Sequence, residues 1–129
     1  MIIDTSALLA VLFAEPEREA ILEAMMTASD LRISAATYVE AGVVVDGRKE
    51  PVLSRDLDDL VATLSIAIAP LTEDQARIAR QAYRDFGRGS GHPARLNYED
   101  CMSYALAKDS REPLLWKGDD FGHTDVRRA

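Results

Sequence analysis

The chain begins Met1-Ile2-Ile3-Asp4-Thr5-Ser6, and this stretch decides the fold. The three apolar residues Met1–Ile3 are typical of a short buried strand, and the apolar segment Ala7–Phe13 that follows shows helical spacing. Asp4 therefore lies at the carboxyl end of a strand, in the turn to the first helix. In open α/β sheets, ligands bind in the crevice outside the carboxyl ends of the strands. We expect Asp4 to face such a crevice, with further acids brought to the same place.

The rest of the chain repeats the alternation of strand and helix. Apolar or alternating runs predict three more strands, at Leu31–Ser34, Ile66–Ala69 and Pro113–Trp116. Helical spacing and capping residues predict helices from Thr5 or Ser6 to about Ala14, and over Glu17–Ala28, Ala35–Asp46, Arg55–Leu64, Thr72–Phe86 and Asn97–Asp109. Two polar stretches, Arg48–Ser54 and Gly87–Leu96, are predicted loops. We therefore expect one α/β domain over residues 1–129, with a central parallel sheet of about four to five short strands flanked by helices.

Composition narrows the class of protein. No apolar run reaches the roughly 20 residues of a membrane span, and the start lacks the basic region of a signal peptide. The single Cys101 excludes an internal disulfide and a cysteine-rich zinc site, and it favours a reduced, cytoplasmic setting. The net charge of −7 by itself argues against nucleic-acid binding, because phosphate contacts need Lys and Arg. Metal ions bound by clustered acids would change that local balance.

Glu40 lies within an apolar stripe of the third predicted helix, formed by Ala36, Val39, Val43 and Val44. A carboxylate in such a stripe is costly unless it is paired or bound to metal. The simpler interpretation is a carboxylate at the edge of the stripe, satisfied by a neighbouring arginine. The pattern alone favours that interpretation.

Three further acids lie near predicted strand or helix ends. Asp100 follows Asn97 by three residues, in the first turn of a helix that is apolar almost all round and is therefore buried. An acid there complements a capping box and the helix dipole, and the helical wheel does not point it at the other acids. Asp119 and Asp120 follow the last predicted strand, so in a parallel sheet they emerge at the same edge as Asp4. A Gly-Asp-Asp turn is common, so Asp119 and Asp120 by themselves do not indicate a functional site. The case for one rests on several acids reaching the same edge of the sheet.

Converging carboxylates favour the hard divalent ions Mg²⁺ or Mn²⁺, which prefer oxygen ligands. His92 and His123 lie in predicted loops, and neither has a partner at zinc spacing. The sequence contains no Gly-rich phosphate loop with a lysine, no nucleophile elbow and no dinucleotide fingerprint. Carboxylate-held Mg²⁺ typically serves phosphoryl chemistry, in which the ion activates water.

These segments together resemble the PIN-domain family, and more closely the VapC-type ribonuclease toxins of bacterial type II toxin–antitoxin pairs. The resemblance rests on the opening stretch through Asp4, on Glu40 in Ala35-Ala-Thr-Tyr-Val-Glu40, on Leu96-Asn-Tyr-Glu-Asp-Cys101 and on Lys117-Gly-Asp-Asp-Phe121. It covers essentially the whole chain, with the motifs in the family's order. The last two segments are far more specific than a lone Asp-Thr-Ser.

The resemblance implies a set of site residues. Asp4 and Asp100 would be the principal Mg²⁺ ligands, and Glu40 would complete the site and help to orient water or a second ion. The family's Asp-Phe pairing favours Asp120 as the fourth acid, with Asp119 as its neighbour or substitute.

Two hydroxyl groups would support these acids. By the same resemblance, Thr5 and Ser6 would hold metal-bound water or the carboxylate of Asp4. The implied reaction is metal-dependent hydrolysis of an RNA phosphodiester bond by activated water, with Mg²⁺ or Mn²⁺ as cofactor.

An RNA substrate needs a local basic rim. Arg77, Arg80 and Arg84 are spaced three and four residues apart and share one helical face, and Arg88 and Arg95 flank the glycine-rich loop before the second acidic motif. We hypothesise that the end of this helix and the loop, through Arg84, Arg88 and Arg95, contact RNA phosphate. The alternative is a solvated arginine face that balances nearby acids.

Family membership implies two protein partners. One is a second copy, which makes a homodimer, and the other is a cognate antitoxin whose tail covers an apolar groove. The first three predicted helices supply apolar residues for that groove, although these could equally be core residues: Leu12, Phe13, Ile21, Leu22, Met25 and Met26.

Two rival functions stay open. A phosphatase of the haloacid dehalogenase type needs a second acid two residues after its nucleophilic aspartate, and here that position is Ser6. The other rival is a non-catalytic PIN-like module whose acids bind a metal or a basic partner only. Loss of activity in a folded Asp4→Asn variant would reject this second rival.

Overall fold

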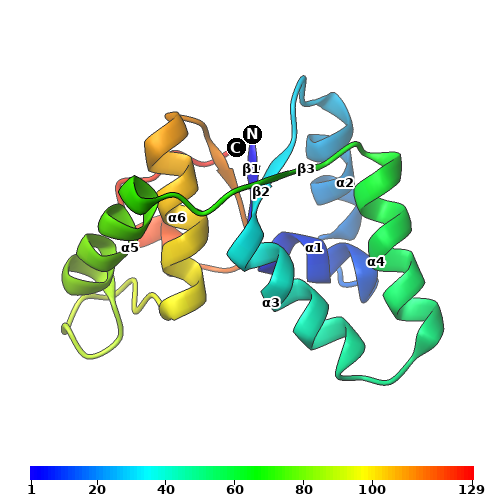
Figure 1. Cartoon of the computed structure of the whole chain (residues 1–129), viewed down its shortest axis with the longest axis horizontal. Helices are drawn as coiled ribbons and strands as arrows, with labels where there is room; N and C mark the ends of the chain where they lie inside the picture. Colours follow the sequence, from blue (N-terminus) through cyan, green and yellow to red (C-terminus); the bar gives the residue numbers. More distant parts are fainter.

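A four-stranded parallel sheet forms the centre of the molecule, in the order β3-β2-β1-β4 (Figure 1). We describe residues 1–129 from a computed structural model. The strands are short: β1 (Ile2–Ile3), β2 (Arg32–Ser34), β3 (Ala67–Ala69) and β4 (Leu114–Leu115). All three strand pairs are parallel, so the four carboxyl ends lie at one edge. The predicted α/β fold with a parallel sheet is confirmed.

Six α-helices and one 3-10 helix surround the sheet. They are α1 (Thr5–Leu12), α2 (Arg18–Thr27), α3 (Ala35–Asp46), α4 (Pro51–Thr63), α5 (Glu73–Phe86), α6 (Tyr98–Ser110) and the 3-10 helix η1 (Asp120–His123). The prediction of a loop over Arg48–Ser54 is wrong, because α4 begins at Pro51. Proline suits a first helical turn, where its missing N–H has no partner to lose. None of the helices has the length and apolar character needed to cross a bilayer.

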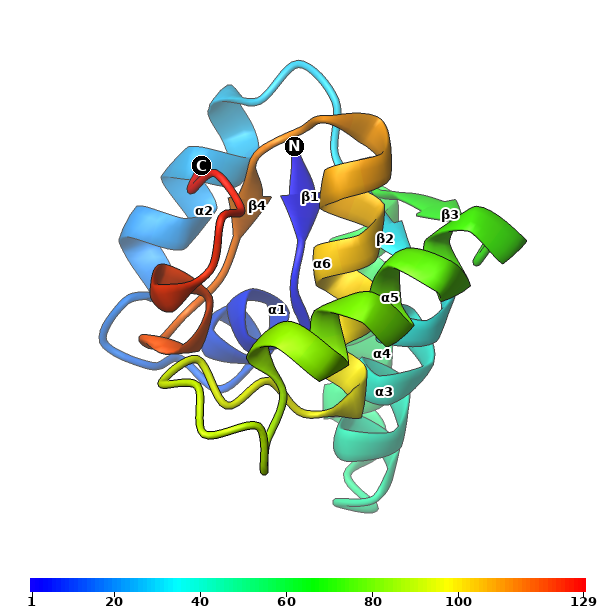
Figure 2. The ribbon, with the colours of Figure 1, turned by 90° about the vertical axis from the view of Figure 1, so that its left-hand side faces the viewer.

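The sheet divides the core into two clusters. Ile2 and Leu114 point to one face, where they pack with α5 and α6, whereas Ile3 and Leu115 point to the other, where they pack with α1–α4. This alternation is the ordinary period of a strand. Both ribbon views show α5 and α6 on one side of the sheet and α1, α2 and α4 on the other (Figures 1 and 2). As predicted, α6 is buried almost all round, from Cys101 to Ala107.

The predicted apolar stripe of α3 is wrong. The buried residues of α3 are Thr37, Ala41 and Val45, whereas Val39 and Val43 are 60% and 68% exposed. The helix is apolar on more than one face, so the positions of its valines do not predict which face packs against the core. Tertiary packing selects the Thr37 face for the core.

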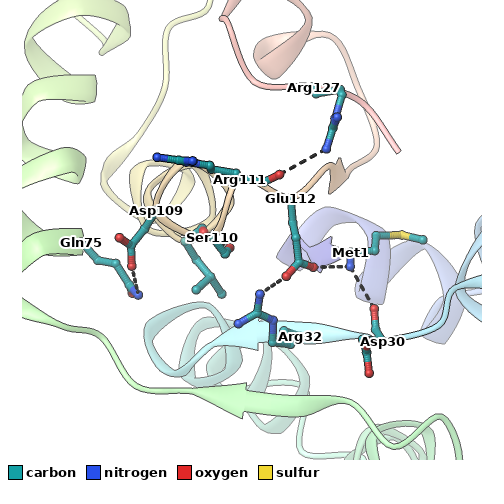
Figure 3. Close-up of polar contacts among 10 residues, drawn as sticks. Met1, Asp30, Arg32, Gln75, Asp109, Ser110, Arg111, Glu112 and Arg127 are labelled. Carbon is teal, nitrogen blue, oxygen red and sulfur yellow. Dashed lines mark hydrogen bonds and ion pairs between the residues drawn. The ribbon is translucent and has the colours of Figure 1, made fainter.

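Polar contacts join the chain segments at the amino-terminal edge of the sheet (Figure 3). The carboxylate of Glu112 accepts hydrogen bonds from Arg32 in β2 and from the ammonium group of Met1. The Met1 ammonium group also donates to the carbonyl oxygen of Asp30, at 2.9 Å. The Glu112 carboxylate therefore has two basic partners, Arg32 and the Met1 ammonium group.

Candidate active site

Asp4 follows β1 at the carboxyl edge of the sheet, and it is only 4% exposed. Its Oδ2 atom accepts hydrogen bonds from the backbone N–H of Ser6, at 2.9 Å, and from the Ser6 hydroxyl, at 2.6 Å. Asp4 is thus the N-cap of α1, where Thr5 or Ser6 was expected. The Ser6 oxygen also accepts from the backbone N–H of Lys117, at 3.0 Å, which ties the segment after β4 to the start of α1. The predicted role of Ser6 as a support of the Asp4 carboxylate has a direct geometric basis.

Glu40 reaches the same region from α3. The Thr5 hydroxyl donates a hydrogen bond to its Oε2 atom and lies 3.3 Å from the carbonyl oxygen of Thr37. Thr5 therefore supports Glu40, whereas the sequence placed it beside Asp4 or a bound water. No arginine pairs with Glu40, so the simpler interpretation of a neutralised edge carboxylate does not hold.

Asp100 is fixed by the start of α6. It forms a capping box with Asn97: its own N–H donates to Asn97 Oδ1, at 2.6 Å, and its Oδ2 accepts from the Asn97 N–H, at 2.7 Å. The predicted cap at Asn97 is confirmed. The capping contact occupies one carboxylate oxygen, and no hydrogen bond reaches Oδ1. Asp100 can therefore serve as a cap and a ligand at the same time.

The electrostatics show that these acids share one space. Burial raises the pKa of Glu40 to about 7, against the hydrogen bond from Thr5, and the charges of Asp4, Glu99 and Asp100 raise it further. Burial likewise raises the pKa of Asp100 to about 6, helped by the charges of Asp4 and Asp120. The charge of Asp4 thus acts on both Glu40 and Asp100, so both carboxylates lie near it.

Asp120 and Asp119 differ in their surroundings. The charge of Asp120 raises the pKa of Asp100, so Asp120 lies near that carboxylate. Asp119 instead lines a hollow beside Trp116 and Arg128. The charge effect on Asp100 is consistent with Asp120 as the fourth acid, and the choice between Asp120 and Asp119 stays a prediction.

A divalent cation fits the chemistry of this set. None of the ion pairs in the protein involves Asp4, Glu40, Asp100 or Asp120. No three acids are close enough to close on one ion as they stand, and no hydrogen bond reaches Oδ1 of Asp4. Hard oxygen donors that repel one another and lack a cation are a suitable ligand set for Mg²⁺ or Mn²⁺.

One of the predicted RNA-binding arginines lies beside the acids. Arg88 lowers the pKa of Asp100, so its guanidinium group is near that carboxylate, and its Nε atom donates to the carbonyl oxygen of Arg95, at 3.3 Å. Arg84 lies on the exposed face of α5, where it contacts Gln81. The ring of His92 packs edge-on against Phe86.

The sequence analysis missed Glu99. Its charge acts on Glu40, which places it at the rim of the acidic space. The signal was present, since Glu99 and Asp100 are adjacent acids at the start of one helix.

Comparisons with known proteins agree with this site and fold. The PIN-domain family matches residues 1–127. Ribonuclease VapC28 of Mycobacterium tuberculosis is 57% identical over 129 residues, which cover 100% of this chain and 97% of that protein. The crystal structure of the M. tuberculosis toxin VapC20, described as cleaving the sarcin–ricin loop, has a TM-score of 0.76 at 12% identity and covers 99% of this chain and 97% of that one. A toxin–antitoxin complex from Klebsiella pneumoniae has a TM-score of 0.72 at 21% identity, with 96% and 92% covered. The chain belongs to the PIN-domain family and, within it, to the VapC-type ribonucleases.

Proposed function

We propose that this chain is the ribonuclease toxin of a toxin–antitoxin pair, acting in the cytoplasm as one domain over residues 1–129. It hydrolyses RNA phosphodiester bonds with Mg²⁺, or Mn²⁺, held by Asp4, Glu40, Asp100 and Asp120. The observation that carries the proposal is the electrostatic coupling of Glu40 and Asp100 to Asp4, and of Asp100 to Asp120, with no ion pair to any of the four. The relatives named VapC ribonucleases, 46–57% identical to this chain, support it.

Each residue has a distinct task in this mechanism. Asp4 and Asp100 would hold the ion, since their capping contacts leave one carboxylate oxygen of each without a hydrogen bond. When bound, the ion activates water for attack on phosphorus. Glu40, oriented by Thr5, accepts a hydrogen bond from the attacking water, and Ser6 fixes the rotamer of Asp4.

The basic rim binds the substrate. Arg88, which lies near Asp100, would hold the phosphate next to the scissile bond, and Arg84 and Arg95 would contact flanking phosphates. These local charges explain how a chain with a net charge of −7 binds RNA.

The test is cleavage of a mixed pool of tRNA, rRNA and mRNA by purified, antitoxin-free protein, in Mg²⁺ and in EDTA. We expect cleavage only in Mg²⁺, and none by Asp4→Asn or Asp100→Asn. Asparagine is also a good N-cap, so Asp4→Asn retains the start of α1. Asp119→Asn is the matched control next to Asp120→Asn: the former should retain activity and the latter should lose it.

The same experiment separates the rival function. No cleavage by folded wild-type protein would favour the non-catalytic binding module. Cleavage that survives both substitutions would contradict the assignment of the site.

The proposal includes a homodimer. Exposed apolar side chains gather on α3, on the β3–α5 segment and at the start of α6; they are Val39, Val43, Ile68, Leu71, Tyr83 and Tyr98. In Figure 2, β3 and α3 lie on the right-hand side of the molecule, and α5 runs toward that side. A groove of about 370 Å³ between α5 and α6 belongs to this apolar surface, which a second copy would cover.

The antitoxin is the second proposed partner, and the structure narrows its candidate surface. Ile21 and Met25 are core residues, so they are removed from the predicted groove. Leu12, Phe13 and Leu22 are half-buried and Met26 is 73% exposed, so these four keep apolar surface for a bound tail.

A further inference from the structure

A buried hydroxyl pair joins α3 to α6 beneath the acids. Thr37 Oγ1 and Ser103 Oγ lie 3.0 Å apart, and both residues are completely buried. Each hydroxyl is the other's partner, and either can be the donor. Because an unpaired buried hydroxyl is costly, this hydrogen bond strongly favours one arrangement of the two helices.

The pair lies one helical turn from two of the acids. Thr37 precedes Glu40 by three residues in α3, and Ser103 follows Asp100 by three residues in α6, so each hydroxyl shares a helix face with an acid. The start of α1 joins the same contact, because the Thr5 hydroxyl lies 3.3 Å from the Thr37 carbonyl oxygen and also binds Glu40. The three elements that carry Asp4, Glu40 and Asp100 therefore meet at this point.

The acids themselves cannot supply this order. The charge of Asp100 disfavours ionisation of Glu40, and neither carboxylate forms an ion pair, so in the absence of an ion this repulsion opposes close packing of α3 against α6. Apolar contacts between the helices resist that force without fixing a register, because they are not directional. A hydrogen bond of defined length does fix a register.

We propose that the Thr37–Ser103 hydrogen bond is a positioning clamp that sets the separation of Glu40 and Asp100, and thereby the affinity of the site for its divalent ion. The inference rests on the proposed function in one respect, namely that these carboxylates bind an ion. Thr37 and Ser103 touch neither the ion nor the RNA, so they are positioning residues.

The first test compares Thr37→Val, Ser103→Ala and the double variant, with Mn²⁺ binding measured by calorimetry and unfolding measured by urea in EDTA. Each single variant leaves one buried hydroxyl unpaired and should lower the urea midpoint, whereas the double variant removes both groups and should recover it. We expect Mn²⁺ binding about 10-fold weaker in all three, the usual scale for a lost outer-shell contact. Thr37→Ser keeps the hydroxyl and should retain affinity. Ser110→Ala, which removes a hydroxyl bonded to the Leu106 carbonyl on the same helix, is the control.

A merely structural role predicts a different result, namely that Mn²⁺ affinity recovers together with stability in the double variant. That result, or unchanged affinity in the single variants, would overturn the proposal.

A second test needs no ion and so separates this inference from the proposed function. The clamp opposes charge repulsion, so Ser103→Ala should lower the urea midpoint less when Asp100→Asn has removed one of the charges. An equal loss in both backgrounds would overturn the clamp even if wild-type protein bound Mn²⁺. If wild-type protein bound no Mn²⁺ while Ser103→Ala lowered the urea midpoint less in the Asp100→Asn background, the proposed ion site would be refuted and the clamp would stay supported.

Discussion

Removal of the Ser6 hydroxyl should weaken both the fold and the metal site. In the native protein this hydroxyl donates to Asp4 Oδ2, at 2.6 Å, and accepts from the backbone N–H of Lys117, at 3.0 Å. Ser6→Ala deletes a hydrogen bond to a charged acceptor and leaves a half-buried N–H without its partner. It also disconnects the start of α1 from the segment that carries Asp120.

The magnitude follows from these two bonds. A hydrogen bond to a charged group contributes roughly 1.5–3 kcal/mol, and an abandoned buried N–H costs roughly 1–3 kcal/mol. The Asp4 carboxylate keeps its bond from the Ser6 N–H, at 2.9 Å, and the site is only partly buried, so the lower ends of these ranges apply. We expect a loss of about 2 kcal/mol in the free energy of unfolding, which for a domain of this size is a fall of roughly 6–10 °C in Tm.

The assay is thermal and urea unfolding in EDTA, followed by Mg²⁺ titration of RNA cleavage. Ser54→Ala is the matched control, because the Ser54 hydroxyl donates to a carboxylate, Asp46 Oδ1 at 2.7 Å, on the exposed surface. That control should cost less than about 1 kcal/mol and leave cleavage unchanged. For Ser6→Ala we expect half-saturation at roughly 10-fold higher Mg²⁺. Equal stability losses in the two variants, or an unchanged Mg²⁺ requirement, would refute the reasoning.

Four further outcomes are expected. The folded-state pKa values of Glu40 and Asp100 are raised to about 7 and about 6, so the folded protein binds more protons than the unfolded chain. The free energy of unfolding in EDTA should therefore fall as the pH rises from about 4.5 to 7. The urea midpoint should change less across this range in Glu40→Gln than in the wild-type protein. Mg²⁺ added at pH 8 should restore stability, and an unchanged midpoint would count against the ion site. Arg88→Ala should reduce RNA cleavage several-fold at low salt. Arg77→Ala should not, because the Arg77 guanidinium already pairs with a glutamate on the exposed face of α5. Equal effects of the two substitutions would contradict a specific phosphate contact at Arg88. Val43→Asp should convert a dimer to a monomer in analytical ultracentrifugation, and a dimer that persists would remove the α3 surface from the interface.

Much of the site could be predicted because it depends on local signals. A parallel sheet sends all strand ends to one edge, so Asp4 after β1 and Asp120 after β4 had to emerge together. Asn97 and Asp100 form a capping box whose spacing is visible in the sequence. The assignment of Glu40 came from its family motif, since the apolar stripe used to place it was wrong.

Other features depended on packing between distant segments. Thr37 meets Ser103, and Ser6 meets Lys117, across 66 and 111 residues, and no local pattern encodes either contact. The exposure of Val39 and Val43 likewise follows from which face of α3 the core accepts.

The sequence by itself determined the α/β class, the order of the elements, most of their bounds and the acids that reach the carboxyl edge, because strand period, helix period and capping act over a few residues. The folded structure was needed to show which hydroxyl supports which acid, that the charge of Asp120 acts on Asp100, and that none of the four acids forms an ion pair. These are properties of side chains brought together from different elements. Their physical basis is the mutual distance of charges and hydrogen-bonding groups, which exists only once the chain has folded.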